Sequence, residues 1–112
     1  CDEGRSTEAW IDFDFFGHQL SAHVRSEAGQ NAGSGTVDGD AVPIPHFGAV
    51  LEWDVWHGLA ERLKNAGVTF LLEPKIRFAG EPGEQGTFFV EDPAGNGVEF
   101  KTFRDPAMIF AH

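Results

Sequence analysis

The sequence predicts an α+β fold built around one βαβββ unit in residues 45–104, with a β-hairpin before it. Two observations lead to this fold class. From residue 46 onward, the spacing of apolar residues changes from two to about 3.6 and back to two, which indicates a strand, a helix and then three strands. Residues 9–24 alternate apolar and polar side chains on both sides of a glycine, which is typical of a hairpin.

The composition bounds the number of domains and the class of partner. The chain has 112 residues, 41% of them hydrophobic, and its 11 Phe and 3 Trp supply much of a core, so one domain is expected. Acidic residues outnumber basic ones 18 to 8, and the formal charge of −10 repels phosphate backbones. No apolar run approaches the roughly 20 residues that span a bilayer. We therefore expect neither nucleic acid nor a membrane as a partner.

The chain contains a single cysteine, Cys1, so an internal disulfide framework is excluded. This fits a reducing compartment, and we expect a cytoplasmic protein. The sequence starts at Cys1 rather than at a methionine and continues directly with charged residues. We therefore expect it to come from the middle of a longer protein.

The first predicted element is the hairpin of residues 9–24. Residues 9–16 alternate apolar and acidic side chains, and residues 19–24 alternate apolar and polar ones, so each strand has one apolar face. Gly17 and His18 are suited to the turn between them. His23 lies on the less apolar face of the second strand.

Residues 26–44 are predicted to be a glycine-rich linker between the two halves of the domain. Four glycines lie among Ser, Asn, Gln and Asp in residues 26–40, with almost nothing to bury, so the segment is expected to be flexible. Long segments of this kind inside a domain tend to be lids, binding loops or linkers. Pro43 and Pro45 stiffen the exit and lead into the strand at His46.

The first and last strands of the βαβββ unit each carry a chemically active side chain. Because side chains alternate across a strand, His46 and Gly48 share the less hydrophobic face, opposite Phe47. In the closing strand, Glu99 lies on the less hydrophobic face with Gly97 and Lys101. If the two strands are neighbours, the imidazole and the carboxylate converge.

Between these strands, a helix and two further strands are expected. Asp54 is a good N-cap, an apolar stripe at helical spacing follows, and Gly67 ends the helix. The stripe consists of Val55, Trp56, Leu59, Leu63 and Ala66. A buried strand is predicted for residues 68–72, and Pro74 is expected to break any ladder after it. Further along the chain, residues 86–91 predict a strand, residues 92–96 a turn and residues 105–112 a tail.

The order of these elements, and above all the Asp-Pro-Ala-Gly-Asn turn before the strand with Glu99, resembles the second module of the glyoxalase/bleomycin-resistance/dioxygenase superfamily, the vicinal oxygen chelate proteins. More narrowly, residues 10–24 and 78–104 are similar to small bacterial proteins labelled predicted extradiol-type dioxygenases. The resemblance covers residues 8–104. It implies a fold of paired βαβββ modules.

Placed on this fold, residues 1–112 form a single domain. Residues 1–25 are a partial first module and residues 45–104 are the second module, with the linker of residues 26–44 between them and the tail after them. The first strand and helix of the first module are absent from the sequence. A module without a strand leaves an edge or cavity that a second copy could cover, so a homodimer is expected.

The resemblance also implies a site. In this superfamily the modules surround a cavity where a divalent metal binds, and the ligands lie on the first and last strands of the modules. His46 and Glu99 match ligand positions. His23 matches either a further metal ligand, as in glyoxalase-like members, or the catalytic acid/base histidine of extradiol dioxygenases. Two histidines and a carboxylate are the ligands of non-haem Fe(II) oxygenases, so Fe(II) is the expected cofactor, with Mn, Zn or Ni as alternatives.

The implied function is that of a metal-dependent oxidoreductase, an extradiol-type dioxygenase that acts on a small oxygenated substrate. An aromatic compound is one candidate for that substrate. Arg77 is a candidate for pairing with an anionic substrate, and Phe78, Phe88 and Phe89 are candidates for walling its pocket, although solvation and core packing are their simpler roles. The chain contains no tyrosine, which such dioxygenases usually keep near the metal. His23 or His18 would therefore have to handle the proton.

Two other functions stay open at this point. A glyoxalase-like lyase or isomerase needs a Lewis acid that holds two substrate oxygens and a base that moves a proton. A non-enzymatic member would use the same concavity to bind an antibiotic or a metabolite. For all three candidate functions, the expected partner is a small molecule.

Overall fold

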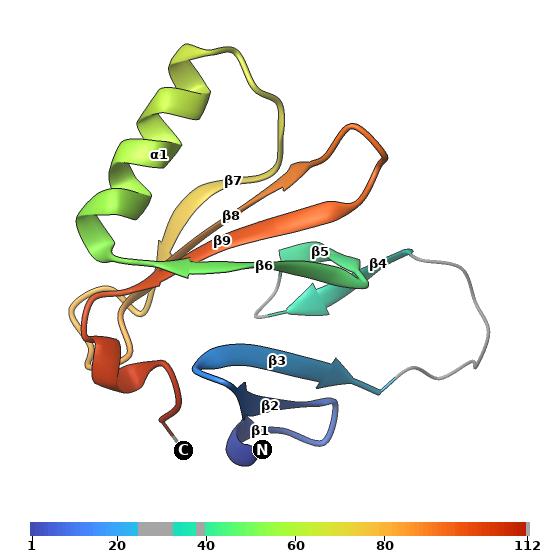
Figure 1. Ribbon diagram of the computed structural model, residues 1–112, viewed down its shortest axis with the longest axis vertical. Coiled ribbons are helices and arrows are strands. Elements are labelled where there is room, and N and C mark those ends of the chain that lie inside the picture. The colour runs from blue at the N-terminus through green and yellow to red at the C-terminus, as the bar shows by residue number, and fades with distance from the viewer. Residues whose placement is uncertain (25–32, 38–39, 112) are drawn as a thin grey trace.

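The computed structural model of the protein describes residues 1–24, 33–37 and 40–111, with the segment 33–37 described by its backbone. Within these residues the chain forms three β-sheets and one α-helix (Figure 1). The fold belongs to the predicted α+β class.

The second half of the chain forms a four-stranded sheet with a helix on one face. Its elements are β6 (His46–Leu51), α1 (Trp53–Asn65), β7 (Phe70–Arg77), β8 (Gln85–Glu91) and β9 (Gly97–Phe103). The strand order is β6-β9-β8-β7, with β6 parallel to β9 and the other pairs antiparallel. The predicted βαβββ unit is confirmed.

The first part of the chain forms a three-stranded antiparallel sheet. Its strands are β1 (Asp2–Ser6), β2 (Trp10–Phe15) and β3 (His18–His23), with β2 in the middle. The β2–β3 hairpin was predicted, and Phe16 and Gly17 turn it with φ angles of 55° and 82°. The strand β1 was not predicted, because its residues are mostly charged or polar and show no apolar alternation. These three strands make up the incomplete first module.

Residues 33–37 and 40–44 depart from the predicted linker. There, β4 (Gly33–Val37) pairs antiparallel with β5 (Asp40–Ile44), so the prediction is wrong for these two ranges. Main-chain hydrogen bonding forms this ladder although most side chains are small, and Val42 adds a buried anchor with 2% exposure. The rest of the predicted linker, residues 26–32 and 38–39, lies outside the described residues.

The ends of α1 partly follow the prediction. The helix begins at Trp53 with Glu52 at the N-cap, so the predicted N-cap at Asp54 is wrong. Asp54 instead lies in the first turn, where a carboxylate interacts favourably with the helix dipole. Gly67 has a φ of 77° and follows the C-cap residue Ala66, which confirms it as the residue that ends the helix.

The hydrophobic core lies between α1 and the four-stranded sheet. Trp56 and Ala60 of the helix pack with Phe88 of β8, and all three side chains are buried. The centre of the Phe88 ring lies 5.5 Å from that of Trp56 and 5.4 Å from that of Phe100. The indole of Trp56 also donates a hydrogen bond of 2.8 Å to the Phe100 carbonyl. Val55, predicted to lie in the apolar stripe, is 53% exposed instead.

Pro74 does not end the strand that contains it. The strand β7 is an edge strand, so the missing N–H of proline can face away from the ladder. The pairing with β8 shifts register between Phe70 and Leu72 and again between Leu72 and Lys75. The predicted break after residue 72 is therefore an irregularity within one continuous strand.

The β1–β3 sheet lies on the side of the four-stranded sheet away from α1 (Figure 1). On its outer face, Leu20 and Val24 are 50% and 74% exposed. The tail that follows β9 contains a short 3₁₀ helix, Pro106–Met108, capped by the side chain of Asp105. In the described part of the chain, no helix has the length and apolar character needed to cross a membrane.

Candidate ligand-binding site

A cavity of about 370 Å³ lies between the β1–β3 sheet and the four-stranded sheet. Its polar wall residues come from β1, β2 and β3 of one sheet and from β6, β7, β8 and β9 of the other. A groove of about 480 Å³ along β3 and β6 shares several of its residues. The predicted site residues that line the cavity are His23, His46, Arg77, Phe78 and Glu99. His18, expected at the hairpin turn, begins β3 and lines the groove.

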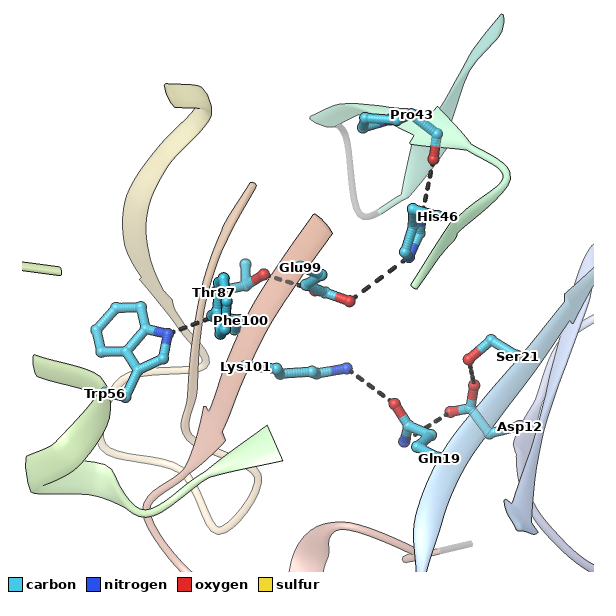
Figure 2. A network of polar contacts seen from close by, with 10 residues as sticks. All are labelled: Asp12, Gln19, Ser21, Pro43, His46, Trp56, Thr87, Glu99, Phe100 and Lys101. Atoms are coloured by element: carbon cyan, nitrogen blue, oxygen red, sulfur yellow. Dashed lines mark hydrogen bonds and ion pairs between the residues drawn. The ribbon is translucent and has the colours of Figure 1, made fainter. Parts of the chain in front are cut away.

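The pairing of β6 with β9 brings His46 and Glu99 together. Gly48 lies opposite Glu99 in the parallel register, and the Nε2 atom of His46 is 3.5 Å from Oε1 of Glu99. The Nδ1 atom of His46 lies 2.6 Å from the Pro43 carbonyl oxygen, so Nδ1 carries a proton and donates it (Figure 2). This leaves Nε2 facing the carboxylate. The predicted convergence of imidazole and carboxylate is confirmed.

The environment favours the charged forms of both members of this pair. Burial by itself lowers the pKa of His46, but Glu99 and the Pro43 carbonyl raise it, and the net result lies above the usual 6.5. Burial raises the pKa of Glu99, but His46, Lys101 and the Thr87 hydroxyl lower it, and the net result lies below the usual 4.5. Thr87 Oγ1 donates a hydrogen bond of 2.6 Å to Oε2 of Glu99.

We expect the His46–Glu99 pair to stabilise the fold most between about pH 4.5 and 6.5, the usual pKa values of the two groups. The raised pKa of His46 gives stability that is complete below 6.5 and is lost as the pH rises through the folded-state pKa. The lowered pKa of Glu99 gives stability that is present above 4.5 and is lost as the pH falls through the folded-state pKa.

Urea unfolding of the wild type and of Glu99→Gln from about pH 4 to 9 measures this effect. The difference in the free energy of unfolding should be greatest near pH 5.5 and smaller at about pH 8. His57→Gln, on the exposed side of α1, serves as the control for replacing a side chain outside the pair. A difference that does not change with pH would contradict the assigned charge states.

A second polar group faces the pair from the β2–β3 hairpin. Asp12 is 5% exposed and accepts hydrogen bonds from the Ser21 hydroxyl at 2.5 Å and from Nε2 of Gln19 at 3.4 Å. A guanidinium nitrogen of Arg5 lies 3.6 Å from the same carboxylate. The alternation in residues 9–16 predicted the apolar face of β2 as the buried one, yet the most buried side chain of the strand is this aspartate. Sequence reasoning missed it because only the opposing sheet buries the polar face.

Lys101 connects the two walls of the cavity. Its Nζ atom donates a hydrogen bond of 3.4 Å to Oε1 of Gln19 and lies 5.2 Å from the centre of the Phe103 ring. Burial lowers the pKa of Lys101 below its usual 10.5, although Glu99 acts in the opposite direction. Sequence reasoning did not select Lys101. The available signal was its place two residues after Glu99, on the same face of the strand.

Arg77 lines the cavity and is held by an acidic residue of β5. Its Nη2 atom donates a hydrogen bond of 2.7 Å to Oδ2 of Asp40, and Nζ of Lys75 lies 2.7 Å from the same oxygen. The hydrogen bond from Lys75 is the main cause of the lowered pKa of Asp40. Arg77 is therefore fixed at the cavity wall, and its predicted contact with a substrate stays a prediction.

The positions of the two phenylalanines of β8 contradict the prediction for one site residue. Phe88, a candidate for the substrate pocket, is 0% exposed and packs in the core under α1. Its neighbour Phe89 lines the cavity instead, with its ring centre 4.8 Å from that of His46. Successive side chains of a strand point to opposite faces, so both cannot face the ligand. Phe78, at the end of β7, does line the cavity.

The described residues do not by themselves fit a protein-held metal ion. No group of three or more His, Cys, Asp or Glu among them is placed to hold one. His46 and Glu99 offer two donor atoms, and His23 lines the same cavity without completing a cluster. The ammonium group of Lys101, which lines the same cavity, adds a positive charge that opposes a divalent cation. The metal-ligand roles of the three predicted residues stay predictions.

Comparison with known proteins places the fold in a family. No family model matches the chain, and no curated protein matches it significantly. The solved structure of a glyoxalase/bleomycin resistance protein/dioxygenase from Alicyclobacillus acidocaldarius is 29% identical and has a TM-score of 0.54; the match covers 98% of this chain and 78% of that one. This likeness supports the predicted resemblance to the glyoxalase/bleomycin resistance/dioxygenase superfamily, and the chain shares its fold. On this fold the chain has one complete module, β6 to β9 with α1, and one incomplete module, β1 to β3.

Two other solved structures are less similar to this chain. One, described as a conserved domain protein, is 17% identical with a TM-score of 0.36, and the match covers 91% of this chain and 76% of that one. The other, from the mobile metagenome of V. Pseudocholerae, is 20% identical with a TM-score of 0.38, and the match covers 93% and 76%.

Proposed function

We propose that this protein binds a small oxygenated organic molecule in the cavity between the β1–β3 sheet and the four-stranded sheet. The observation that carries the proposal is the cavity itself, about 370 Å³ in volume, where polar side chains from both sheets converge. Small-molecule sites in proteins are typically concave, a few hundred Å³ in volume, and combine apolar walls with a few polar groups.

The walls offer a surface for an aromatic or unsaturated body. Trp10, Val42, Phe78 and Phe89 line the cavity among the polar groups. The His46 imidazole meets the Phe89 ring edge to face, with an angle of 88° between the planes, so both rings are held in place. Aromatic rings favour stacked and edge-to-face partners, so these side chains favour a ligand that contains a ring.

The polar groups can bind oxygen atoms of such a ligand without a metal. The carboxylate of Glu99 can accept a hydrogen bond from a ligand hydroxyl, and Nε2 of His46 can donate one to a ligand oxygen when the ring is charged. Each of the two residues is oriented by a second hydrogen-bond partner. Thr87 donates to Glu99, and His46 donates to the Pro43 carbonyl. Preorganised groups of this kind lower the cost of binding.

We expect small aromatic compounds with hydroxyl, carbonyl or carboxyl groups to bind equally well with and without a chelator. Isothermal titration calorimetry with EDTA-treated protein measures this. His46→Ala and Glu99→Ala should each weaken binding by about tenfold or more, because each removes a charged hydrogen-bond partner. His57→Ala, at an exposed position of α1, should leave the affinity unchanged. Unchanged affinity in both site variants, or no binding at all, would refute the proposed site.

A metal-dependent enzyme is the second candidate, and the orientation of His46 favours it. Because Nδ1 is bonded to the Pro43 carbonyl, Nε2 faces Glu99 as it would in a ligating imidazole. The same titration after anaerobic Fe(II) loading separates the candidates. About one iron per chain, lost in His46→Ala and accompanied by oxygen uptake with catechols, would favour the extradiol-type dioxygenase. Tight Zn, Ni or Mn without oxygen uptake would favour the glyoxalase-type lyase or isomerase.

A further inference from the structure

Lys101 brings a positive charge into the cavity of a chain whose formal charge is −10. It lies on β9 two residues after Glu99, so both side chains leave the same face of the strand. Its ammonium group lies 5.2 Å from the centre of the Phe103 ring and reaches across the cavity toward β3 (Figure 2). Lys101 is half-buried, and an ammonium group partly withdrawn from water needs acceptors or a counter-ion.

The hydrogen bonds of Lys101 are incomplete within the protein. An ammonium group has three N–H donors. Within the described part of the chain, its hydrogen-bond acceptor is Oε1 of Gln19, at the long distance of 3.4 Å. Gln19 is held in place from its other end, since its amide nitrogen donates to the Ile109 carbonyl at 3.1 Å. Two donors of Lys101 are therefore available to a molecule in the cavity.

The carboxylates near Lys101 have closer partners of their own. Glu99 accepts a hydrogen bond of 2.6 Å from Thr87 and pairs with His46 at 3.5 Å. On the opposite wall, Asp12 is bonded within the β2–β3 hairpin. These carboxylates screen the charge of the ammonium group but do not satisfy its donors. An additional anionic oxygen would complete the set.

We propose that Lys101 anchors the carboxylate of the bound molecule, so that the cavity takes a small aromatic carboxylic acid in its anionic form. This deepens the function proposed above and rests on it. The ligand carboxylate accepts the two available donors of Lys101, and the ring lies against Phe89 and Trp10 on the cavity walls. A hydroxyl group on the ring reaches the pair of His46 and Glu99.

The charge of the cavity favours a monoanion over a more highly charged ligand. One ammonium group can balance one carboxylate, whereas a phosphate monoester carries nearly two negative charges at neutral pH. The two guanidinium groups at the cavity wall, those of Arg5 and Arg77, already face Asp12 and Asp40. The net charge of −10 opposes each added negative charge at long range.

Matched pairs of acid and amide test the anchor directly. Benzoate and benzamide, and 4-hydroxybenzoate and 4-hydroxybenzamide, differ mainly in charge, and their affinities can be measured by ligand titration in NMR spectra. Wild-type protein should bind each acid about tenfold or more tightly than its amide, since hydrogen bonds to charged groups are worth about that factor. Lys101→Met should abolish the preference and leave the amide affinity nearly unchanged.

Lys64→Met is the matched control, because Lys64 is exposed on α1 and far from the cavity walls. It should keep the preference for the acids. Equal affinity of wild-type protein for acid and amide, or a preference that persists in folded Lys101→Met, would overturn the anchor and leave the proposed function standing. If Lys101→Met does not fold, Lys101→Gln is the second variant, and it too should lose the preference for the acids. No binding of any of the four compounds would overturn both proposals.

Discussion

Gly48→Ala is expected to separate β6 from β9 or to unfold the protein. A Cβ atom at this position would lie 1.7 Å from the carbonyl oxygen of Glu99 and 2.6 Å from its carbonyl carbon. Both are backbone atoms of the paired strand, so no side-chain rotation relieves the overlap. The expected loss in the free energy of unfolding is about 3 kcal/mol or more. Chemical denaturation measures it.

A second glycine provides the control. Gly58 lies within α1, and a Cβ atom there meets nothing within 4 Å. Gly58→Ala should therefore stabilise the protein by about 0.5–1 kcal/mol, because alanine is the better helix former. If Gly48→Ala were as stable as Gly58→Ala, the close parallel pairing of β6 with β9 would be wrong. The placement of His46 beside Glu99 would then be wrong with it.

Phe88→Ala is the other change with a large expected effect, a loss of about 3–5 kcal/mol in the free energy of unfolding. The side chain is 0% exposed and touches the rings of Trp56, Phe70 and Phe100, so its removal leaves a cavity in the main core. Thermal and urea unfolding measure the loss. Phe16→Ala removes the same atoms from a position that is 89% exposed, and should cost much less.

Phe88→Ala also tests which face of β8 meets the ligand. Phe88 points toward α1 and Phe89 toward the cavity. Under conditions where both variants are folded, Phe89→Ala should weaken ligand binding while Phe88→Ala leaves it nearly intact. The reverse result would restore Phe88 as the pocket residue that the sequence first indicated.

Several features of the site could be predicted from the sequence because they depend on local rules. Alternation along a strand placed His46 and Glu99 on the less apolar faces of their strands, and Gly67 marked the end of the helix. The turn before Glu99 is closed by Asp92, whose carboxylate accepts hydrogen bonds from the backbone of Ala94 and Asn96. Each of these signals is carried by a few neighbouring residues.

Other features depend on which elements meet. Residues 2–6, 33–37 and 40–44 pair into strands although their side chains carry no apolar alternation, because main-chain hydrogen bonds to a neighbouring strand suffice. The apolar face of β2 was the natural choice for burial, yet Asp12 is the residue that the opposing sheet covers. Pro74 ends no strand, because β7 lies at the edge of its sheet.

By itself, then, the sequence determined the order of strand and helix in the second module, the hairpin before it, and the sides of the strands on which His46 and Glu99 lie. Periodicity and turn chemistry act within a few residues and can be read directly. Only the tertiary structure decided that Phe89 rather than Phe88 faces the cavity and that Lys101 and Asp12 belong to it. The physical reason is that burial and charge compensation depend on the opposing sheet, whose residues lie far away in the chain.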